Sequence, residues 1–240
     1  MAELPITAHL SSIAETLKKS PSNIAVLTAE TAAGKSTAVP PFFLSAFPGR
    51  ILMLEPRRVA ALAIAERIAE TLGERCGETV GYRMRLESRI SRNTRIEIIT
   101  EAVLTRMIQN DPALTGVSVV ILDEFHERSL HGDLALALLR EVVTLRGDLR
   151  VLVMSATINA EKIAAILDSP VVSVPGRTWP VEIVHKASSQ PRRIGDAVAD
   201  AVLEELRETD STGILCFLPG IADIRLAEQR LQNCGAEVAV

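Results

Sequence analysis

A run of six residues, Val117–Leu122, ends abruptly in two adjacent carboxylates, Asp123 and Glu124. The run is almost entirely apolar and mostly β-branched, which is typical of a strand buried on both faces, as in a parallel sheet. Carboxylates at the end of a buried strand are costly unless they have partners. In open α/β sheets, ligands bind at the carboxyl edge of the strands. We therefore expect Asp123 and Glu124 to meet a ligand that brings a cation, such as a magnesium–nucleotide complex.

Other short apolar runs alternate with helical segments, which predicts βαβ units and a mostly parallel sheet in an α/β fold. The runs expected to form strands are Ile24–Thr28, Ile51–Leu54, Thr79–Arg83, Ile96–Ile99, Arg150–Met154, Val171–Val174 and Gly213–Phe217. Helices are expected over Ile6–Lys19, Val59–Leu72, Ala102–Gln109, Asp133–Arg146, Ala160–Leu167, Ile194–Glu208 and Ile221–Gln232. A further helix is expected after residue 37, with Pro40 and Pro41 near its start, where a missing backbone donor costs little.

The composition limits the kinds of partner and location. The 240 residues carry a formal net charge of −4, so any nucleic-acid contact must come from a local basic patch. Five Phe, one Tyr and one Trp are too few for a module that stacks bases on a sheet. The three scattered cysteines fit a reducing compartment better than a disulfide framework or a zinc site. There is no secretory signal and no apolar run of the ~20 residues that cross a bilayer, which predicts a soluble, cytoplasmic protein.

A phosphate-binding loop is indicated by Gly34, Lys35 and Ser36, which match the end of the G-x-x-x-x-G-K-[ST] pattern, although Ala29 replaces its first glycine. The segment stands between a predicted strand and a predicted helix, where backbone N–H groups can surround phosphates. Lys35 is expected on the β- and γ-phosphates and the Ser36 hydroxyl on Mg²⁺. The alternative is a glycine-capped turn with an exposed lysine. The residues predicted to bind the nucleotide are Ala29, Glu30, Thr31, Ala32, Ala33, Gly34, Lys35, Ser36 and Thr37.

Asp123 and Glu124 fit the complementary half of a nucleotide site. Asp123 is expected to hold Mg²⁺ through its water shell, and Glu124 to polarise the attacking water. The alternative, an acidic helix N-terminus, explains one carboxylate but not the buried strand before it. A zinc site at His126 and His131 is disfavoured, because a spacing of five turns the second histidine away from the first on a helix.

Basic residues and small hydroxyls follow other predicted strands. Arg57 and Arg58 come after Ile51–Leu54, at the ligand-facing edge of the sheet, which favours contact with nucleic-acid phosphates. Five arginines crowd residues 83–95, and for Arg89 to Arg95 a solvated loop and a phosphate-binding surface are equally good explanations. Ser155-Ala156-Thr157 also follows a predicted strand and is expected to link the nucleotide to neighbouring segments.

In their order along the chain, these motifs resemble those of the superfamily 2 DExH/DEAH-box ATP-dependent helicases. The matching stretches are residues 29–37, Glu55–Ala61, Thr100–Arg106, Asp123–Arg128 and Ser155–Thr157. Residues 81–89 and the phenylalanine in the acidic motif look most like the bacterial HrpB-type family. The resemblance covers nearly the whole chain, and five ordered motifs make it specific.

The resemblance implies RecA-like P-loop NTPase domains that bind ATP and Mg²⁺ between them and RNA or another single strand across their tops. The first RecA-like domain is expected at residues 1–187 and the truncated beginning of a second at 188–240, with Ser188–Pro191 as a linker. The residues that the resemblance places against nucleic acid are Arg57, Arg58, Thr100, Glu101 and Arg106. His126 falls where the family couples hydrolysis to strand movement, and Ser155 and Thr157 on the motif that links the two. Arg67 matches an arginine that packs on adenine.

The implied function is that of an ATP-dependent RNA helicase of the DExH class, with Glu124, Lys35, Asp123 and His126 as its catalytic residues. The family's second domain supplies arginines to the transferring phosphoryl group, and no such motif precedes Val240. The remainder of that domain is therefore expected to be missing and the 240-residue chain to hydrolyse ATP weakly. The alternatives are a nucleotide- and RNA-binding fragment without turnover, and a P-loop ATPase that acts on a partner other than nucleic acid.

Overall fold

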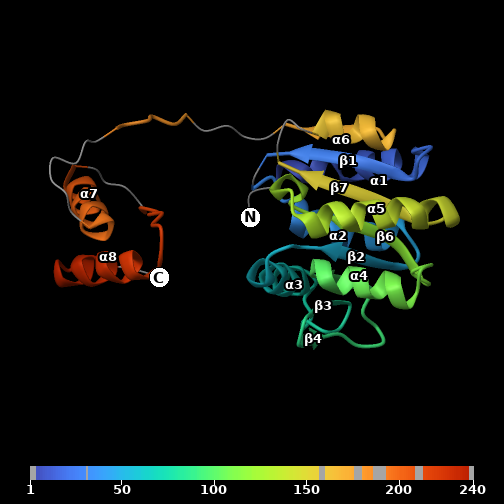
Figure 1. Cartoon of the computed structure of the whole chain (residues 1–240), viewed down its shortest axis with the longest axis horizontal. Helices are drawn as coiled ribbons and strands as arrows, with labels where there is room; N and C mark the ends of the chain where they lie inside the picture. The colour runs from blue at the N-terminus through green and yellow to red at the C-terminus, as the bar shows by residue number, and fades with distance from the viewer. Residues whose placement is uncertain are drawn as a thin grey trace. The chain divides into compact units, whose positions relative to one another are not determined.

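The computed structural model describes residues 4–30, 32–156, 160–175, 180–185, 193–208 and 213–237. The chain forms two compact units that divide between residues 179 and 180 (Figure 1). The boundary expected at 187/188 and the linker expected at Ser188–Pro191 lie outside the described residues.

The first unit is built on an eight-stranded sheet of order β4-β3-β5-β2-β6-β7-β1-β8. Its strands are β1 (Ile24–Ala29), β2 (Arg50–Leu54), β3 (Val80–Met84), β4 (Glu87–Arg89), β5 (Ile96–Ile99), β6 (Val117–Leu122), β7 (Arg150–Ser155) and β8 (Val171–Val174). Every neighbouring pair is parallel except β3 and β4, which form an antiparallel hairpin. The mostly parallel α/β fold predicted from the sequence is confirmed.

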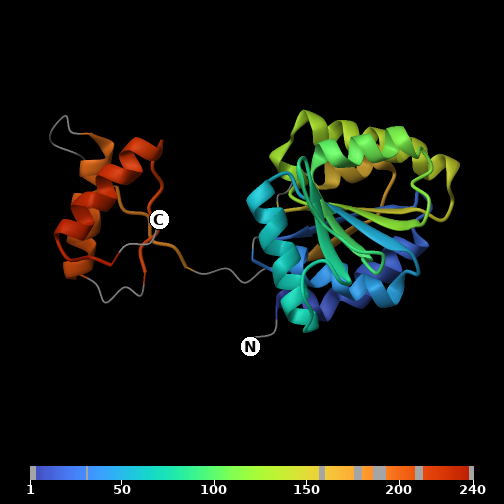
Figure 2. The same cartoon turned by 90° about the horizontal axis from the view of Figure 1, so that it is seen from below.

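Helices cover both faces of this sheet (Figure 2). One face carries α1 (Leu10–Lys19), α2 (Lys35–Ala46) and α3 (Arg58–Leu72), and the other carries α4 (Glu101–Asn110), α5 (Leu130–Leu145) and α6 (Ala160–Leu167). Successive side chains of each central strand point to opposite faces, so each strand must be apolar along its whole length. In β2, for example, Ile51 and Met53 pack under the first set of helices and Leu52 and Leu54 under the second.

The two prolines of α2 lie in its second turn, so the expectation that they stand near its start was wrong. Neither ring can donate the hydrogen bond that the carbonyls of Ser36 and Thr37 receive in a regular helix. The helix tolerates this loss because it packs into the core next to them: Pro40 is buried, as are Val39 and Phe43.

The described residues of the second unit include the helices α7 (Ile194–Glu208) and α8 (Ile221–Asn233), which pack through a small cluster of buried apolar residues. Arg230 of α8 forms an ion pair with Asp196 of α7 at 3.0 Å. The prediction of a strand at Gly213–Phe217 was wrong, because these described residues have no strand partner. A strand needs a hydrogen-bonded neighbour, and here Leu215 and Phe217 remain exposed.

Within the described parts of the chain, no helix combines the length and the apolar character that a membrane span requires.

Candidate functional site

The parallel strands of the first unit end at one edge of the sheet, and the predicted site residues follow these ends. β1 and β7 are in register with Thr28 opposite Ser155, and β2 and β6 are in register with Leu54 opposite Leu122. The phosphate-loop segment therefore leaves β1 at the same edge where Asp123 leaves β6. This is the edge at which α/β sheets bind ligands.

The loop between β1 and α2 has a left-handed backbone at its end. Gly34, the residue before α2, has φ +91°, and a Cβ there would also meet the side chain of Leu4 at 2.7 Å. The N-terminal segment supports the loop further, because the Ile6 N–H donates to the Ala33 carbonyl at 3.2 Å. Ala29 ends β1 opposite Val174, in an extended conformation that alanine adopts without strain. Thr31 lies outside the described residues.

Lys35 is buried, and its ammonium group donates to the carbonyls of Ala29 at 2.6 Å and Glu30 at 3.0 Å. Burial lowers the pKa of Lys35, while the carboxylates of Asp123 and Glu124 raise it. The lysine thus lies within electrostatic reach of both strand-end carboxylates, in a loop that surrounds it with oxygen atoms. A cation in this position is suited to binding phosphate oxygens.

Asp123 is buried, and its two carboxylate oxygens have different surroundings in the described part of the chain. Oδ1 accepts from the Glu124 N–H at 2.9 Å, whereas Oδ2 is buried with no hydrogen-bond donor among the described residues. Burial raises the pKa of Asp123 to about 6, although the Ser36 hydroxyl lowers this pKa. Mg²⁺ at nucleotide sites is held by one or two carboxylates together with substrate phosphates. The orphaned Oδ2 and the neighbouring Ser36 hydroxyl fit such an ion.

Glu124 directly precedes a single 3-10 turn, η2 (Phe125–Glu127), and has a left-handed conformation with φ +49° and ψ +33°. Its Oε2 lies 3.3 Å from His126 Nε2, and His126 Nδ1 accepts from the Ala156 N–H at 3.3 Å. Those two contacts fit a neutral imidazole that carries its proton on Nε2. His126 therefore connects the second strand-end carboxylate to the segment after β7. Ser155 is buried at the end of β7, and Thr157 lies outside the described residues.

The residues predicted to contact nucleic acid lie on or just before two helices, α3 and α4. Arg57 precedes α3 and Arg58 begins it, and both are exposed. Arg57 Nη2 lies 2.8 Å from Glu127 Oε1, and Arg58 Nη2 lies 3.7 Å from Glu87 Oε2. Both arginines are thus partly neutralised by carboxylates of other elements.

The remaining predicted contacts lie on or beside α4. Thr100 precedes this helix, and Arg106 is exposed on it. The Glu101 carboxylate accepts a hydrogen bond from the Ser129 hydroxyl, which in turn caps α5. Glu101 therefore ties the start of α4 to the start of α5.

Two of the arginines in residues 83–95 have structural partners. Arg83 forms an ion pair with the buried Glu97 at 2.8 Å, and Arg95 donates to backbone carbonyls, including that of Phe47 at 3.0 Å. Arg92 is exposed. Arg67 is paired with Glu70 on α3 at 2.6 Å, and no described contact connects it to the phosphate loop.

Glu55 and Glu127 lie next to the site but were not predicted from the sequence as site residues. Glu55 follows β2, is buried, and accepts the Arg57 N–H at 3.1 Å. Burial raises the pKa of Glu55 to about 7, and the charges of Asp123 and Glu124 add to the effect. The signal that identified Asp123, an acid directly after a buried strand, could have identified Glu55 as well. Glu127 had no comparable signal.

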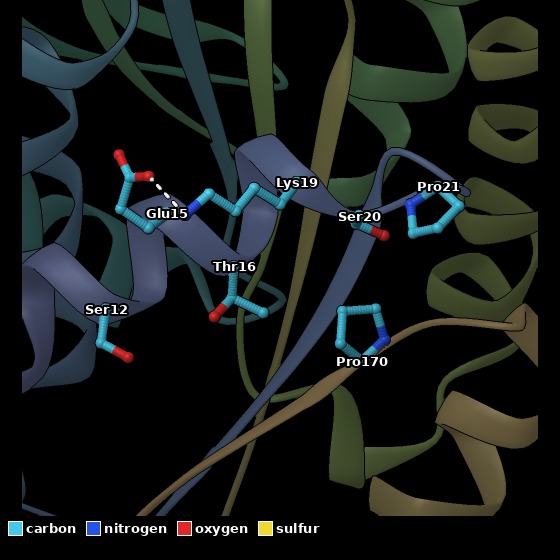
Figure 3. A pocket seen from close by; sticks show the side chains of 7 residues that line it. All are labelled: Ser12, Glu15, Thr16, Lys19, Ser20, Pro21 and Pro170. Atoms are coloured by element: carbon cyan, nitrogen blue, oxygen red, sulfur yellow. Dashed lines mark ion pairs between the residues drawn. The ribbon is translucent and has the colours of Figure 1, made fainter.

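Two hollows in the first unit lie at opposite edges of the sheet. An open hollow of about 370 Å³ lies between α1 and the residues before β1 and β8, at the amino ends of these strands (Figure 3). It is lined by Ser12, Glu15, Thr16, Lys19, Ser20, Pro21 and Pro170. It is therefore on the opposite edge of the sheet from Lys35 and Asp123. A much smaller cavity of about 20 Å³ lies at η2, where Asp123, Glu124 and Glu127 are among its lining residues.

Both the sequence and the structure match known helicases. A family model described as DEAD/DEAH box helicase matches residues 7–166. The chain is 48% identical over 244 residues to "ATP-dependent RNA helicase HrpB" of Escherichia coli (strain K12), covering 99% of this chain and 30% of that protein. It is 35% identical over 243 residues to "Probable ATP-dependent RNA helicase DHX34" of Homo sapiens, covering 97% of this chain and 21% of that protein. The crystal structure of Escherichia coli DEAH/RHA helicase HrpB matches with a TM-score of 0.90 and 47% identity, covering 96% of this chain and 30% of that one.

The chain thus spans about 30% of the length of HrpB. The structural match and the mostly parallel sheet confirm that the fold is RecA-like. The family model covers most of the first unit, which holds the phosphate loop and both strand-end carboxylates. The chain belongs to the DEAD/DEAH box helicase family.

Proposed function

We propose that this chain is the ATP-binding part of an ATP-dependent RNA helicase of the DExH class. One observation carries the proposal: a buried lysine in a glycine-ended loop follows β1 at the same edge of the parallel sheet at which Asp123 and Glu124 follow β6. The names of the relatives, which are ATP-dependent RNA helicases, support the same activity.

The loop is proposed to bind the nucleotide through its backbone, Lys35 and Ser36. The backbone N–H groups before α2 and the Lys35 ammonium hold the phosphates, because a helix N-terminus favours negative charge. The Ser36 hydroxyl and Asp123 hold Mg²⁺, for which the orphaned Oδ2 is the strongest support. Mg²⁺ held there would neutralise charge on the phosphates.

Glu124 acts on the attacking water. Its carboxylate orients the water and accepts its proton, the role of a general base. His126 holds Glu124 on one side and the Ala156 N–H on the other, so it couples the catalytic carboxylate to the segment that begins at Ser155.

We propose further that Arg57, Arg58, Thr100, Glu101 and Arg106 form the surface that binds single-stranded RNA through its backbone. Arg67 is proposed to pack on adenine, and residues from 180 onwards to begin a second RecA-like domain. A cytoplasmic location is proposed from the three scattered cysteines.

The proposal is tested by Glu124→Gln in the whole protein, with Glu141→Gln, an exposed residue of α5, as the matched control. We expect RNA-stimulated ATP hydrolysis to fall by about 10²-fold or more, since general-base catalysis contributes on this order. Binding of a fluorescent ATP analogue should stay within about two-fold, because Glu124 acts on the water and not on the phosphates. Unchanged hydrolysis in Glu124→Gln would contradict the proposed mechanism.

A further inference from the structure

The Arg57 side chain, which is proposed to bind a phosphate of the strand, is already engaged by the protein. Its Nη2 lies 2.8 Å from Glu127 Oε1, and its Nε lies 3.9 Å from Glu55 Oε1. The Arg57 N–H also donates to Glu55 Oε1 at 3.1 Å. A phosphate can take the guanidinium group in full only by displacing the Glu127 carboxylate.

Glu127 belongs to the same turn as the catalytic carboxylate. The Glu127 N–H donates to the Glu124 carbonyl at 2.9 Å, and this hydrogen bond closes η2. The residues on either side of the turn, Glu124 and Arg128, both have left-handed backbones, with φ +49° and +53°. Such conformations are strained for residues other than glycine. A cavity of about 20 Å³, which is about the room of one water molecule, adjoins Glu124 and Glu127.

We propose that Glu127 is an internal competitor for Arg57, so that binding of the nucleic-acid strand releases Glu127 and resets the turn that carries Glu124. The inference rests on the proposed function, because it takes Arg57 as a phosphate contact and Glu124 as the catalytic carboxylate. Glu127 is a positioning residue, since it acts on the reaction through η2.

The exposure of the pair suits this exchange. The Arg57 side chain is 62% exposed and the Glu127 side chain 35%, so solvent screens their attraction and the pair is weak. An RNA phosphate is a charge-assisted partner of comparable geometry for a guanidinium group. Once a phosphate occupies Arg57, Glu127 faces a second negative group and is repelled. A fully buried pair could not exchange partners in this way without a large penalty.

A second ion pair in the same segment provides the matched control. Arg128 Nη2 lies 3.0 Å from Asp133 Oδ2, with side chains 58% and 41% exposed. Asp133→Asn removes the same charge as Glu127→Gln without freeing Arg57. A general rise in the attraction of the surface for RNA would therefore affect both variants alike.

The experiment measures binding of fluorescein-labelled oligouridine to the 240-residue chain by fluorescence anisotropy, at about 50 and about 200 mM salt. The proteins are the wild type, Glu127→Gln, Asp133→Asn, Arg57→Ala and the double variant Arg57→Ala/Glu127→Gln. We expect Glu127→Gln to bind about two- to five-fold tighter than wild type, the scale of an exposed ion pair. Arg57→Ala should bind more weakly with a shallower salt dependence, and in its background Glu127→Gln should have no effect.

Any of three results would contradict the proposal that Glu127 competes for Arg57. Glu127→Gln could bind oligouridine like wild type, Asp133→Asn could gain as much affinity as Glu127→Gln, or the gain from Glu127→Gln could persist in the Arg57→Ala background. Failure of the proposed function gives a different pattern, in which Arg57→Ala binds as well as wild type or neither binds oligouridine.

The link to Glu124 is tested separately in the whole protein. Glu127→Gln should raise ATP hydrolysis without RNA and lower the ratio of stimulated to unstimulated rates, while Asp133→Asn leaves both unchanged. An unstimulated rate equal to wild type in Glu127→Gln would overturn this link, because the turn would then be insensitive to the loss of the pair.

Discussion

Two buried carboxyl groups, Glu55 and Asp123, lie at the ends of neighbouring strands. β2 and β6 pair in register up to Leu54 and Leu122, so the residues that follow are adjacent. Burial is the largest cause of the raised pKa of each group, to about 7 for Glu55 and about 6 for Asp123. The free oxygen of Asp123 is available to bind a cation, which suits the proposed nucleotide site. Ionisation of the two buried groups, however, lowers the stability of the folded chain.

Replacement of Glu55 by Gln should stabilise the chain in a pH-dependent way. The pKa of Glu55 is about 7 when folded and near 4.5 when unfolded, so the folded state binds the proton more tightly. Stability therefore falls as pH rises from about 4.5 to 7, and Glu55→Gln removes this loss. We expect the variant to be more stable than wild type by on the order of 2 kcal/mol at about pH 8, with a much smaller difference at about pH 5.

Urea unfolding at the two pH values measures this effect, with Glu66→Gln, an exposed residue of α3, as the control. An equal difference between Glu55→Gln and wild type at both pH values would show that ionisation of Glu55 is not its cause.

The sequence predicts that Lys35, Asp123 and Glu124 lie at one edge of the sheet. Each of them follows an apolar run that predicts a strand, and each belongs to a short recognisable motif. The partners of Arg57 could not be predicted in this way. Glu127 is far from Arg57 in sequence, and no sequence pattern around either residue predicts that the two are paired. Such pairs depend on the register between strand ends, which the sequence does not state.

At the scale of elements, the β3–β4 hairpin places a carboxylate against the surface that is proposed to bind nucleic acid. Glu87 of β4 pairs with Arg58, and it also accepts from the Tyr82 hydroxyl at 2.8 Å. The hairpin is closely packed at Gly81, where a Cβ would meet the Arg89 carbonyl oxygen at 2.2 Å. A backbone atom cannot move aside as a flexible side chain can, so this contact requires glycine.

Gly81→Ala should therefore lower the free energy of unfolding by about 1–3 kcal/mol, the scale of overpacking. Gly147→Ala is the control, because a Cβ there meets nothing within 4 Å. Urea unfolding of both variants measures the difference. Equal stability of the two variants would mean that β4 moves away from β3 at little cost.

Strands with apolar runs could be predicted, and those defined by their partners could not. β6 matches its predicted bounds, Val117–Leu122, because its residues are buried on both faces. β4 consists of Glu87–Arg89, all exposed, and exists only through its pairing with β3. The reverse holds for Gly213–Phe217, whose apolar residues suggested a strand but find no described neighbour. Strand pairing is non-local, so local pattern alone fails in both directions.

At the scale of the whole molecule, the two units have separate cores of very different size. The first unit has an extensive apolar core on each face of its sheet, whereas the second buries a small cluster between α7 and α8. Lys35, Ser36, Asp123 and Glu124 all lie in the first unit. Binding of Mg–ATP should therefore stabilise the first unit by mass action, whether or not the second is present.

A chain of residues 1–179 should accordingly fold and keep the thermal shift produced by Mg–ATP. At a ligand concentration of about 100 Kd, binding adds about 2.7 kcal/mol, which raises the unfolding temperature of a unit of this size by roughly 5–10 °C. Lys35→Ala should abolish the shift in both the short and the 240-residue chain. Scanning calorimetry measures it, and loss of the shift on removal of residues 180–240 would show that the second unit supplies part of the nucleotide affinity.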